Sequence, residues 1–293
     1  MELSRRQFSV RGIASAIAPL AFPASAGLII PSSSKSRGQD AAAGGGDASY
    51  SAYQSTLVNG LTPSSVVWNG RKWRCAAGSS WNPGMDYSVR LTAHKARFEL
   101  RNTENDHGER DPVVKRRAEL HSPARPRLPN DVPLWGAMSF IHHHWADPAG
   151  MATRWGGAHG QLHIGSTFGG SPAVAFRRHG DGKFRISTRG EFADGNTVRY
   201  DAPLAFDVAH DLVYRVVLSP TNGSLMVWLN RRKIVDLQGV SIGSHQAECY
   251  WNIGNYYAGG VTCPVIAEFA NHVYPDPASL AGRLAVSPGW PAA

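Results

Sequence analysis

The sequence has 293 residues, of which 18% are charged, and this composition excludes a coiled coil or a highly charged disordered chain. Lysine and arginine outnumber aspartate and glutamate by 30 to 22, which favours an acidic partner such as a polyanionic glycan, a nucleic acid or an anionic surface. The three cysteines form no CxxC pair, so a zinc ribbon or a thioredoxin-type site is not expected. Cys249 and Cys263 flank one aromatic stretch, and their spacing leaves open whether they pair.

The N-terminus has the features of an export signal. An arginine pair at 5–6 is followed by an apolar run at 13–22 and by Ala-Ser-Ala at 24–26, an A-x-A cleavage site. Residues 1–26 are therefore predicted to be a twin-arginine signal, which places the mature protein in the periplasm or outside the cell. The apolar run is short and contains a proline, so no stable membrane insertion is expected.

The rest of the chain divides into a linker and one folded domain. Residues 27–48 are rich in Ser, Ala and Gly and predict a flexible linker, and the domain spans 49–293. Within it, short alternating runs recur between Gly- and Pro-containing turns, with Asn69-Gly70 as a strong hairpin signal and no helix of ordinary length. The predicted strands are 66–68, 87–91, 96–101, 135–145, 160–166, 173–177, 184–188, 212–218, 224–229, 250–257 and 265–274.

This pattern of strands predicts the fold class. Many short strands with Gly and Pro turns are typical of an all-β sandwich, and at this length a β-jelly roll of the concanavalin-like kind is expected. One of its two sheets is expected to be concave and open, and to bind the substrate.

The stretch 250–257 is the most aromatic part of the domain. Alternation along a strand places one set of its residues on one face: Tyr250, Asn252, Gly254 and Tyr256. Trp251 and Ile253 point to the core. The polar, aromatic face suits a sugar chain, with Gly254 leaving room for the substrate. The alternative is a strand that is aromatic for packing alone.

Two strand segments carry groups that are able to bind or polarise an anion. Arg117 and Glu119 share a face, and an arginine held by a glutamate can bind a carboxylate with two hydrogen bonds. Gln161 and His163 also share a face, so that a general base lies beside an amide donor. The alternatives are a structural ion pair and a structural histidine. Arg97 begins a similar Arg-x-Glu-Leu run, Arg97-Phe98-Glu99-Leu100, which competes with the run that begins at Arg117.

A run of three histidines invites a metal site. His142 and His144 share a face of the predicted strand, which suits first-row metals. No glutamate follows at the spacing that metal sites on similar folds require, so no metal is predicted. The alternatives are a row that lines the substrate and a second candidate for the base.

Three motifs in order resemble those of the jelly-roll polysaccharide lyases: Arg117-Ala118-Glu119-Leu120, Gln161-Leu162-His163 and the 250–257 stretch with its Tyr-aromatic-x-x-Gly-x-Tyr pattern. They are similar to motifs of the family-seven alginate lyases. The wider run also resembles the heparin lyase I-like superfamily, which includes glucuronan lyases, because Arg97-Phe98-Glu99 and an acidic loop with Asp106 come first.

The resemblance implies β-elimination on a uronate-containing polysaccharide of the glucuronan, alginate or glycosaminoglycan type. Arg117 and Gln161 would neutralise the uronate carboxylate, and His163 and Tyr256 would transfer the protons, with their order left open. Glu119 would hold Arg117. Further substrate contacts are predicted for Arg97, Arg110, His142, His144, Tyr250 and Asn252. No cofactor is expected to be required, a structural calcium ion is left open, and the protein is expected to be a monomer.

The sequence departs from the alginate lyase pattern at two positions. Asn252 replaces its lysine and His121 replaces its closing arginine, so two positive charges are absent and the identity of the uronate stays open. The main alternative function is a non-catalytic β-sandwich that binds acidic glycans. A glycoside hydrolase would need two facing carboxylates, for which Glu99 and Glu119 are the only pair considered. No nucleic-acid-binding motif occurs, so no such partner is expected.

Overall fold

The structure is a computed structural model, and it describes residues 66–73, 87–102, 116–122, 132–152, 157–164, 172–190, 195–244 and 249–291. These residues all belong to one compact unit, Gly46–Ala293. The predicted export signal, the linker, Asp106 and Arg110 lie outside the described residues.

Antiparallel strands form three sheets in the described part of the chain. The six-stranded sheet has the order β10 (Thr197–Pro203), β9 (Lys183–Thr188), β8 (Pro172–Arg178), β7 (Gly157–Ile164), β14 (Cys249–Tyr257), β5 (Arg116–His121). The seven-stranded sheet has the order β13 (Arg232–Ile242), β12 (Ser219–Leu229), β11 (His210–Val217), β6 (Leu134–His142), β15 (Val265–Asp276), β4 (Lys95–Leu100), β3 (Val89–Leu91). A small hairpin pairs β1 (Val66–Trp68) with β2 (Arg71–Trp73), and the two short helices are α2 (Pro148–Ala152) and α3 (Ala281–Ala285).

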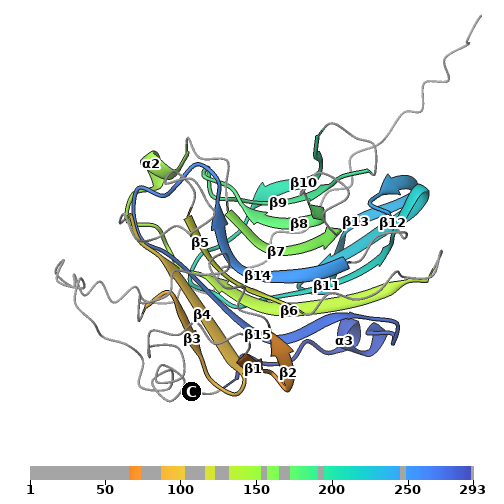
Figure 1. Cartoon of the computed structure of the whole chain (residues 1–293), viewed down its shortest axis with the longest axis horizontal. Helices are drawn as coiled ribbons and strands as arrows, with labels where there is room; N and C mark the ends of the chain where they lie inside the picture. Colours follow the sequence, from red (N-terminus) through yellow and green to blue (C-terminus); the bar gives the residue numbers. More distant parts are fainter. Residues whose placement is uncertain are drawn as a thin grey trace, which may run out of the picture. The chain divides into compact units, whose positions relative to one another are not determined.

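The two larger sheets pack face to face and bend in the same direction, with the six-stranded sheet on the inside of the curve (Figure 1). Alternate residues of each strand fill the space between them. Trp251 of β14 stacks on Tyr214 of β11 with ring centres 5.2 Å apart, and Phe140 of β6 stacks on Phe184 of β9 at 5.6 Å. The fold is therefore the β-jelly-roll sandwich that the sequence predicts.

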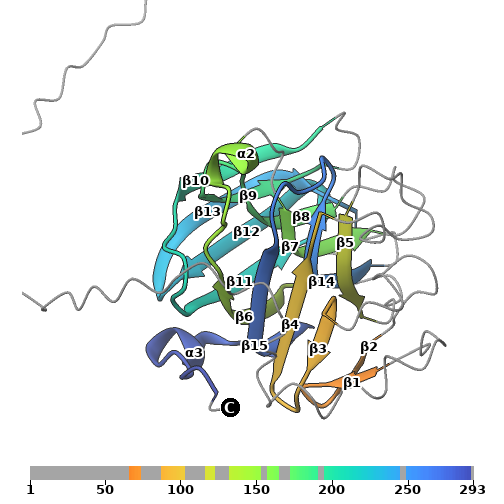
Figure 2. The same cartoon turned by 90° about the vertical axis from the view of Figure 1, so that its left-hand side faces the viewer.

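The predicted hairpin at Asn69-Gly70 is confirmed. Both residues have positive φ, 51° and 69°, as a two-residue turn of the favoured hairpin type requires. The turn brings Trp68 and Trp73 together with ring centres 5.5 Å apart, and both rings contact His272 of β15. Figure 2 shows this hairpin close to β3 at the lower end of the sandwich.

Two strands, β10 and β13, were not predicted from the sequence. Each is the outermost strand of its sheet, so each has a neighbour on one side only. Their residues are mostly exposed or half-buried on both faces, which removes the alternation that reveals a half-buried strand. Edge strands with many polar residues are common, because they resist pairing with other chains.

Cys249 and Cys263 are both buried, and no disulfide joins them. Their side chains belong to the hydrophobic core between the sheets. Among the described residues, no helix is both long enough and apolar enough to cross a bilayer.

Candidate active site

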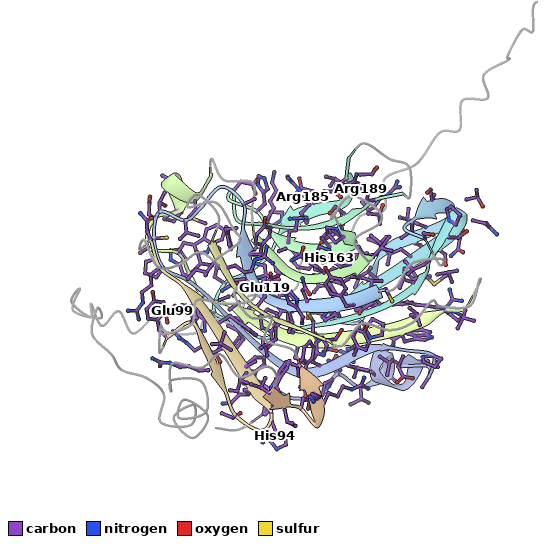
Figure 3. The ribbon with its side chains drawn as sticks, in the orientation of Figure 1. His94, Glu99, Glu119, His163, Arg185 and Arg189 are labelled. Atoms are coloured by element: carbon purple, nitrogen blue, oxygen red, sulfur yellow. The ribbon has the colours of Figure 1, made fainter. Side chains whose placement is uncertain are left out.

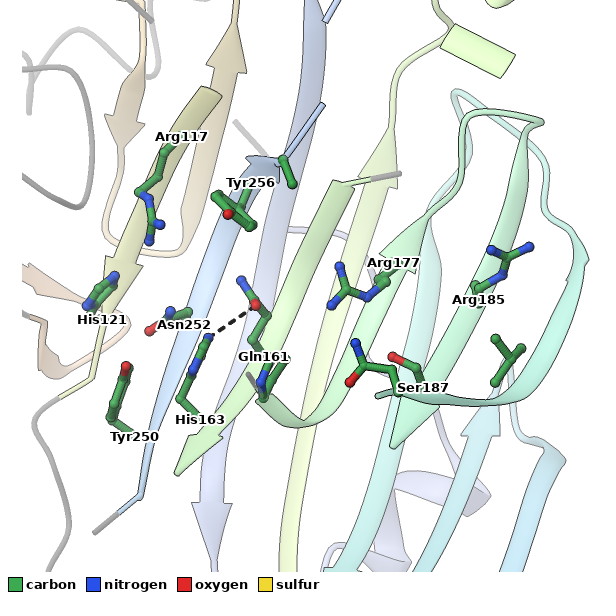
Figure 4. A pocket seen from close by; sticks show the side chains of 14 residues that line it. Arg117, His121, Gln161, His163, Arg177, Arg185, Ser187, Tyr250, Asn252 and Tyr256 are labelled. Carbon is green, nitrogen blue, oxygen red and sulfur yellow. Dashed lines mark hydrogen bonds between the residues drawn. The ribbon is translucent and has the colours of Figure 1, made fainter. Parts of the chain in front are cut away.

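A cleft lies on the face of the six-stranded sheet that points away from the core (Figure 4). Its floor is built by side chains from all six strands of the sheet, together with Asn196 before β10 and Ala258 after β14. The lining residues are Arg117, His121, Gln161, His163, Pro172, Arg177, Arg185, Ser187, Asn196, Val198, Tyr250, Asn252, Tyr256 and Ala258.

The register of β14 brings the predicted site residues together. Tyr256 pairs with Arg117 of β5 on one side, and Asn252 pairs with Gln161 of β7 on the other. Because residues that face each other across antiparallel strands share a face, the three motifs meet in one row of side chains. Tyr250 pairs with His163 in the same way. Six of the predicted site residues therefore line one cleft: Arg117, Gln161, His163, Tyr250, Asn252 and Tyr256.

A chain of hydrogen bonds connects β5 to β7. The Arg117 Nη1 atom donates to Glu119 Oε2 at 3.1 Å, and Gln161 Nε2 donates to Glu119 Oε1 at 2.7 Å. Gln161 Oε1 lies 3.2 Å from His163 Nε2, the contact drawn in Figure 4. Glu119 is only 1% exposed, so this carboxylate is a fixed anchor below the floor of the cleft.

The hydrogen bonds also define the protonation of His163. The carboxylate of Glu119 only accepts hydrogen bonds, so Gln161 presents its N–H to Glu119 and its oxygen to His163. His163 Nε2 therefore carries a proton and donates it. The other ring nitrogen, Nδ1, is buried and has no hydrogen-bond partner among the described residues. Burial, followed by the charges of Arg117 and Arg177, lowers the pKa of His163 to about 4, so its ring is neutral at neutral pH.

Aromatic contacts hold the remaining rings of the cleft. His163 stacks on Tyr250 with ring centres 5.2 Å apart and planes 5° apart, and His121 stacks on the same tyrosine at 5.8 Å. The guanidinium carbon of Arg117 lies 4.5 Å from the centre of the Tyr256 ring. Tyr256 is half-buried, so a cation lies beside a tyrosine that is accessible from the cleft.

Gly254 does not have the role that the sequence suggested. It was expected to leave room for the substrate, but a Cβ atom there would lie 2.2 Å from the carbonyl oxygen of Ala118 and 2.8 Å from the Cα of Glu119. Gly254 has a φ of 139° and, with Asn255, lies at an irregularity where β14 has extra residues opposite His159 of β7. The glycine therefore permits the close approach of β5 to β14.

The same irregularity turns His159 into the core. His159 has the same sequence parity as Gln161 and His163, yet its ring lies 4.1 Å from that of His142 between the two sheets. Burial is the main cause that lowers the pKa of His159 to about 3. The prediction that His142 lines the substrate is therefore corrected: its side chain is 2% exposed and its pKa is lowered well below its usual value by burial.

Two other predicted residues also lie outside this cleft. His144 is exposed after the end of β6, with its ring 5.4 Å from that of Phe206. Arg97 lies on β4, in the seven-stranded sheet, where its Nη1 atom is 2.6 Å from Glu99 Oε2. Figure 3 shows Glu99 at the β4 side of the molecule, away from Glu119 and His163. Glu99 and Glu119 thus do not form the facing carboxylate pair of a glycoside hydrolase.

Sequence reasoning missed the β8 and β9 part of the cleft. Arg177 on β8 pairs with Arg185 on β9, and Ser187 lines the cleft next to Arg185. The signal for Arg177 was present in the alternation of β8, because Val174 and Phe176 are core residues and their neighbours point to the other face. Arg185 is partly neutralised by Asp201 of β10, whose Oδ2 accepts from its Nη2 at 2.8 Å.

No metal centre is found in the described part of the chain, where no three His, Cys, Asp or Glu side chains gather closely enough to hold an ion. His142 and His143 point to different surroundings: His142 is in the core, whereas His143 Nε2 lies 2.8 Å from Glu268 Oε1.

Comparison with known proteins gives structural similarities only. No protein family profile and no curated protein matches the sequence. Among solved structures, an endo-β-1,4-glucuronan lyase from the fungus Trichoderma reesei is 10% identical, with a TM-score of 0.45 over 60% of this chain and 78% of that chain. The family 7 alginate lyase A1-II′ with bound substrate is 12% identical, with a TM-score of 0.47 over 66% and 83%. An alginate lyase from Klebsiella pneumoniae is 12% identical, with a TM-score of 0.46 over 63% and 82%. At such identities and TM-scores the similarities do not decide the reaction, so the functional assignment depends on the residues of the cleft.

Proposed function

We propose that this protein is a polysaccharide lyase that cleaves a uronate-containing chain by β-elimination. The observation that carries the proposal is the hydrogen-bonded series from Arg117 through Glu119 and Gln161 to His163, lying beside Tyr256 in one cleft. Each of the three motifs occurs in many proteins. Their convergence on one row of side chains, with a cation, an amide donor, a neutral imidazole and a phenol, is what the reaction requires.

The chemistry begins at the uronate carboxylate. C5–H is weakly acidic, and hydrogen bonds to the adjacent carboxylate stabilise the negative charge that develops when the proton leaves. Gln161 Nε2 has two N–H groups, of which one donates to Glu119, so the second is available to the substrate. The C5 proton passes to a base, a C4–C5 double bond forms, and the C4–O4 bond breaks with its electron pair on O4, which takes up a proton. The products are a new alcohol and an unsaturated uronate end.

Tyr256 is the better placed of the two proton-transfer candidates. Its side chain reaches the open cleft beside Arg117, whereas the unprotonated Nδ1 atom of His163 is buried. In this proposal Tyr256 transfers a proton directly at the substrate. His163, neutral and donating from Nε2, holds the amide of Gln161 in the orientation that faces the carboxylate.

The deciding experiment combines a substrate panel with the Tyr256→Phe variant. Glucuronan, alginate and glycosaminoglycans are incubated with the wild-type protein, and the ultraviolet absorbance of the unsaturated product is followed. On the polymer that is cleaved, Tyr256→Phe should lower kcat by roughly 10²- to 10⁴-fold, the usual contribution of a proton-transfer group, and leave the affinity nearly unchanged. A melting curve equal to that of the wild type is the control for folding.

Three results would contradict the proposal or its assignment. Full activity in Tyr256→Phe would remove Tyr256 from the proton transfer. Retention on an acidic polysaccharide column without absorbance from any polymer would favour a glycan-binding protein that lacks catalysis. New reducing ends without unsaturation would indicate hydrolysis.

The location of the protein outside the cytoplasm is also a proposal. It is supported by the arginine pair at 5–6, the apolar run at 13–22 and the A-x-A site at 24–26. Replacing both arginines by lysine should keep the precursor in the cytoplasm, as fractionation and the mass of the mature N-terminus would show. Export that is unchanged by this replacement would exclude the twin-arginine route.

A further inference from the structure

Arg177 differs from the other arginines of the cleft in what surrounds it. Arg117 is paired with Glu119 at 3.1 Å, and Arg185 is paired with Asp201 at 2.8 Å. Within the described part of the chain, Arg177 has no hydrogen-bond or ion-pair partner. A guanidinium that has lost part of its hydration without gaining an acid is costly, so the site is incomplete until an anion is bound.

The sheet places Arg177 next to the reacting groups. Tyr256 of β14 pairs with Ala158 of β7, and Ala158 in turn pairs with Arg177 of β8. Ala158 contributes only a methyl group, so no large side chain of β7 separates the arginine from the tyrosine. Tyr256 therefore lies between Arg117 on one side and Arg177 on the other, as Figure 4 shows.

The charges around Tyr256 are not symmetric. Glu119 compensates the charge of Arg117, and the same carboxylate accepts from Gln161. Burial lowers the pKa of Arg177, which is consistent with lost hydration, whereas Tyr256 and Glu119 act in the opposite direction. The guanidinium stays protonated at any working pH. The uncompensated positive charge at the centre of the cleft is therefore that of Arg177.

We infer that Arg177 is a carboxylate-binding residue, which receives a uronate carboxylate on the side of Tyr256 away from Arg117. The inference rests on the proposed lyase function for the identity of the anion. A planar guanidinium offers a carboxylate two parallel hydrogen bonds, which a lysine cannot reproduce. A carboxylate site at Arg177 also explains how the cleft would bind a polyanion although Asn252 and His121 replace two basic residues of the alginate lyase pattern. The positive charge is then supplied by β8.

The test measures binding without turnover. In the Tyr256→Phe background, the affinities for glucuronan and for polymannuronate alginate are compared with those for the same polymers after chemical reduction of their carboxyl groups. Arg177→Gln should weaken binding of the acidic polymer by roughly 10- to 100-fold, the usual effect of losing a charge-assisted hydrogen bond. On the carboxyl-reduced polymer, the Arg177→Gln variant and its parent should bind equally.

Two variants serve as controls. Arg215→Gln removes the same charge from a half-buried position of β11 in the other sheet and should change neither affinity by more than about twofold, since charges distant from the cleft are screened by salt. Arg177→Lys keeps the charge but cannot form the two parallel hydrogen bonds of a guanidinium, so its affinity should fall between those of the parent and Arg177→Gln. Because Lys preserves charge and length, it also tests the inference if the Gln variant does not fold.

The outcomes separate this inference from the proposed function. Unsaturated product with an unchanged KM in Arg177→Gln would overturn the inference and leave the lyase in place. Carboxylate-dependent binding that is lost in Arg177→Gln, without product from the wild type, would overturn the lyase and support the inference. Equal losses on acidic and carboxyl-reduced polymers would overturn the role of Arg177 as a carboxylate ligand.

Discussion

Two strands of this protein, β4 and β5, carry nearly the same Arg-x-Glu pattern, but only β5 contributes side chains to the cleft. On β4, Glu99 binds Arg97 of the same strand and Arg101 just beyond its end, each at 2.6 Å. On β5, Glu119 binds Arg117 of its own strand and also Gln161 of β7, two strands away in the sheet. An Arg-x-Glu run therefore becomes part of a site only when the sheet brings a second partner to the carboxylate.

The first test of this comparison breaks the connection on β5. Glu119→Gln keeps the shape of the side chain but offers only a neutral acceptor to Arg117 and Gln161. The side-chain amide of Gln161 can then rotate. This rotation misplaces the N–H group of Gln161 that faces the substrate. We expect kcat/KM on the cleaved polymer to fall by about 100-fold, as small misplacements of catalytic groups do.

The matched control is the same substitution on the other strand. Glu99→Gln loosens the contacts of Arg97 and Arg101, which do not line the cleft, and should leave kcat/KM within about twofold. Equal losses from both variants would mean that the carboxylates act through general stability, and the comparison between the strands would fail.

A second test breaks the contact between β5 and β14 without touching a charge. Gly254→Ala places a methyl group against the backbone of Ala118 and Glu119 at a φ of 139°, which only glycine adopts readily. We expect a loss of roughly 3 kcal/mol in the free energy of unfolding, measured by denaturant titration. Gly282→Ala in α3 is the control, because nothing lies within 4 Å of its added Cβ. Similar stabilities for the two variants would contradict the tight approach of β5.

A third test concerns pH and His159, which lies opposite the irregularity of β14. The pKa of His159 is about 3 in the folded protein and near 6.5 when unfolded, so the unfolded state binds the proton first. His159 therefore does not lower the free energy of unfolding above about pH 6.5. Between that pH and about 3, it lowers this free energy by about 1.4 kcal/mol for each pH unit of acidification. In His159→Leu, the slope of the free energy of unfolding against pH should be smaller by the contribution of one proton. Urea unfolding measured at a series of pH values from 7 to 4 gives this slope. An unchanged slope would show that His159 titrates normally.

Alternation made much of the fold and site predictable. On β14 it assigned Trp251 to the core and Tyr256 to the cleft, and on β7 it placed Gln161 with His163. On β8 it separates Arg177, on the cleft face, from Arg178, on the core face, but it does not predict how a buried arginine is accommodated. Arg178 is fully buried, donates to the carbonyl of Leu204 at 2.7 Å and lies over an aromatic ring, an environment that no local pattern announces.

Tertiary contacts decided the remaining cases. His142 and His144 share a strand face in the sequence, but only the packing of the sheets determined that His142 meets His159 in the core. Arg97 and Arg117 each begin the same Arg-x-Glu-Leu pattern, and only their places in different sheets distinguish them. The irregularity of β14 opposite His159 depends on the close approach of β5, β14 and β7. The sequence does not show this approach, so Gly254 was predicted to make room for the substrate, whereas it makes room for β5.

Asn255, next to that glycine, has a consequence for how the cleft is prepared. Its buried amide donates to the carbonyl of Phe98 at 3.0 Å and to that of Val265 at 3.2 Å, both on the opposite sheet. The residue that follows it is Tyr256. The tyrosine is therefore anchored through its neighbour to the other layer of the sandwich, and the entropy of positioning its backbone is lost during folding. A substrate does not have to supply that free energy when it binds.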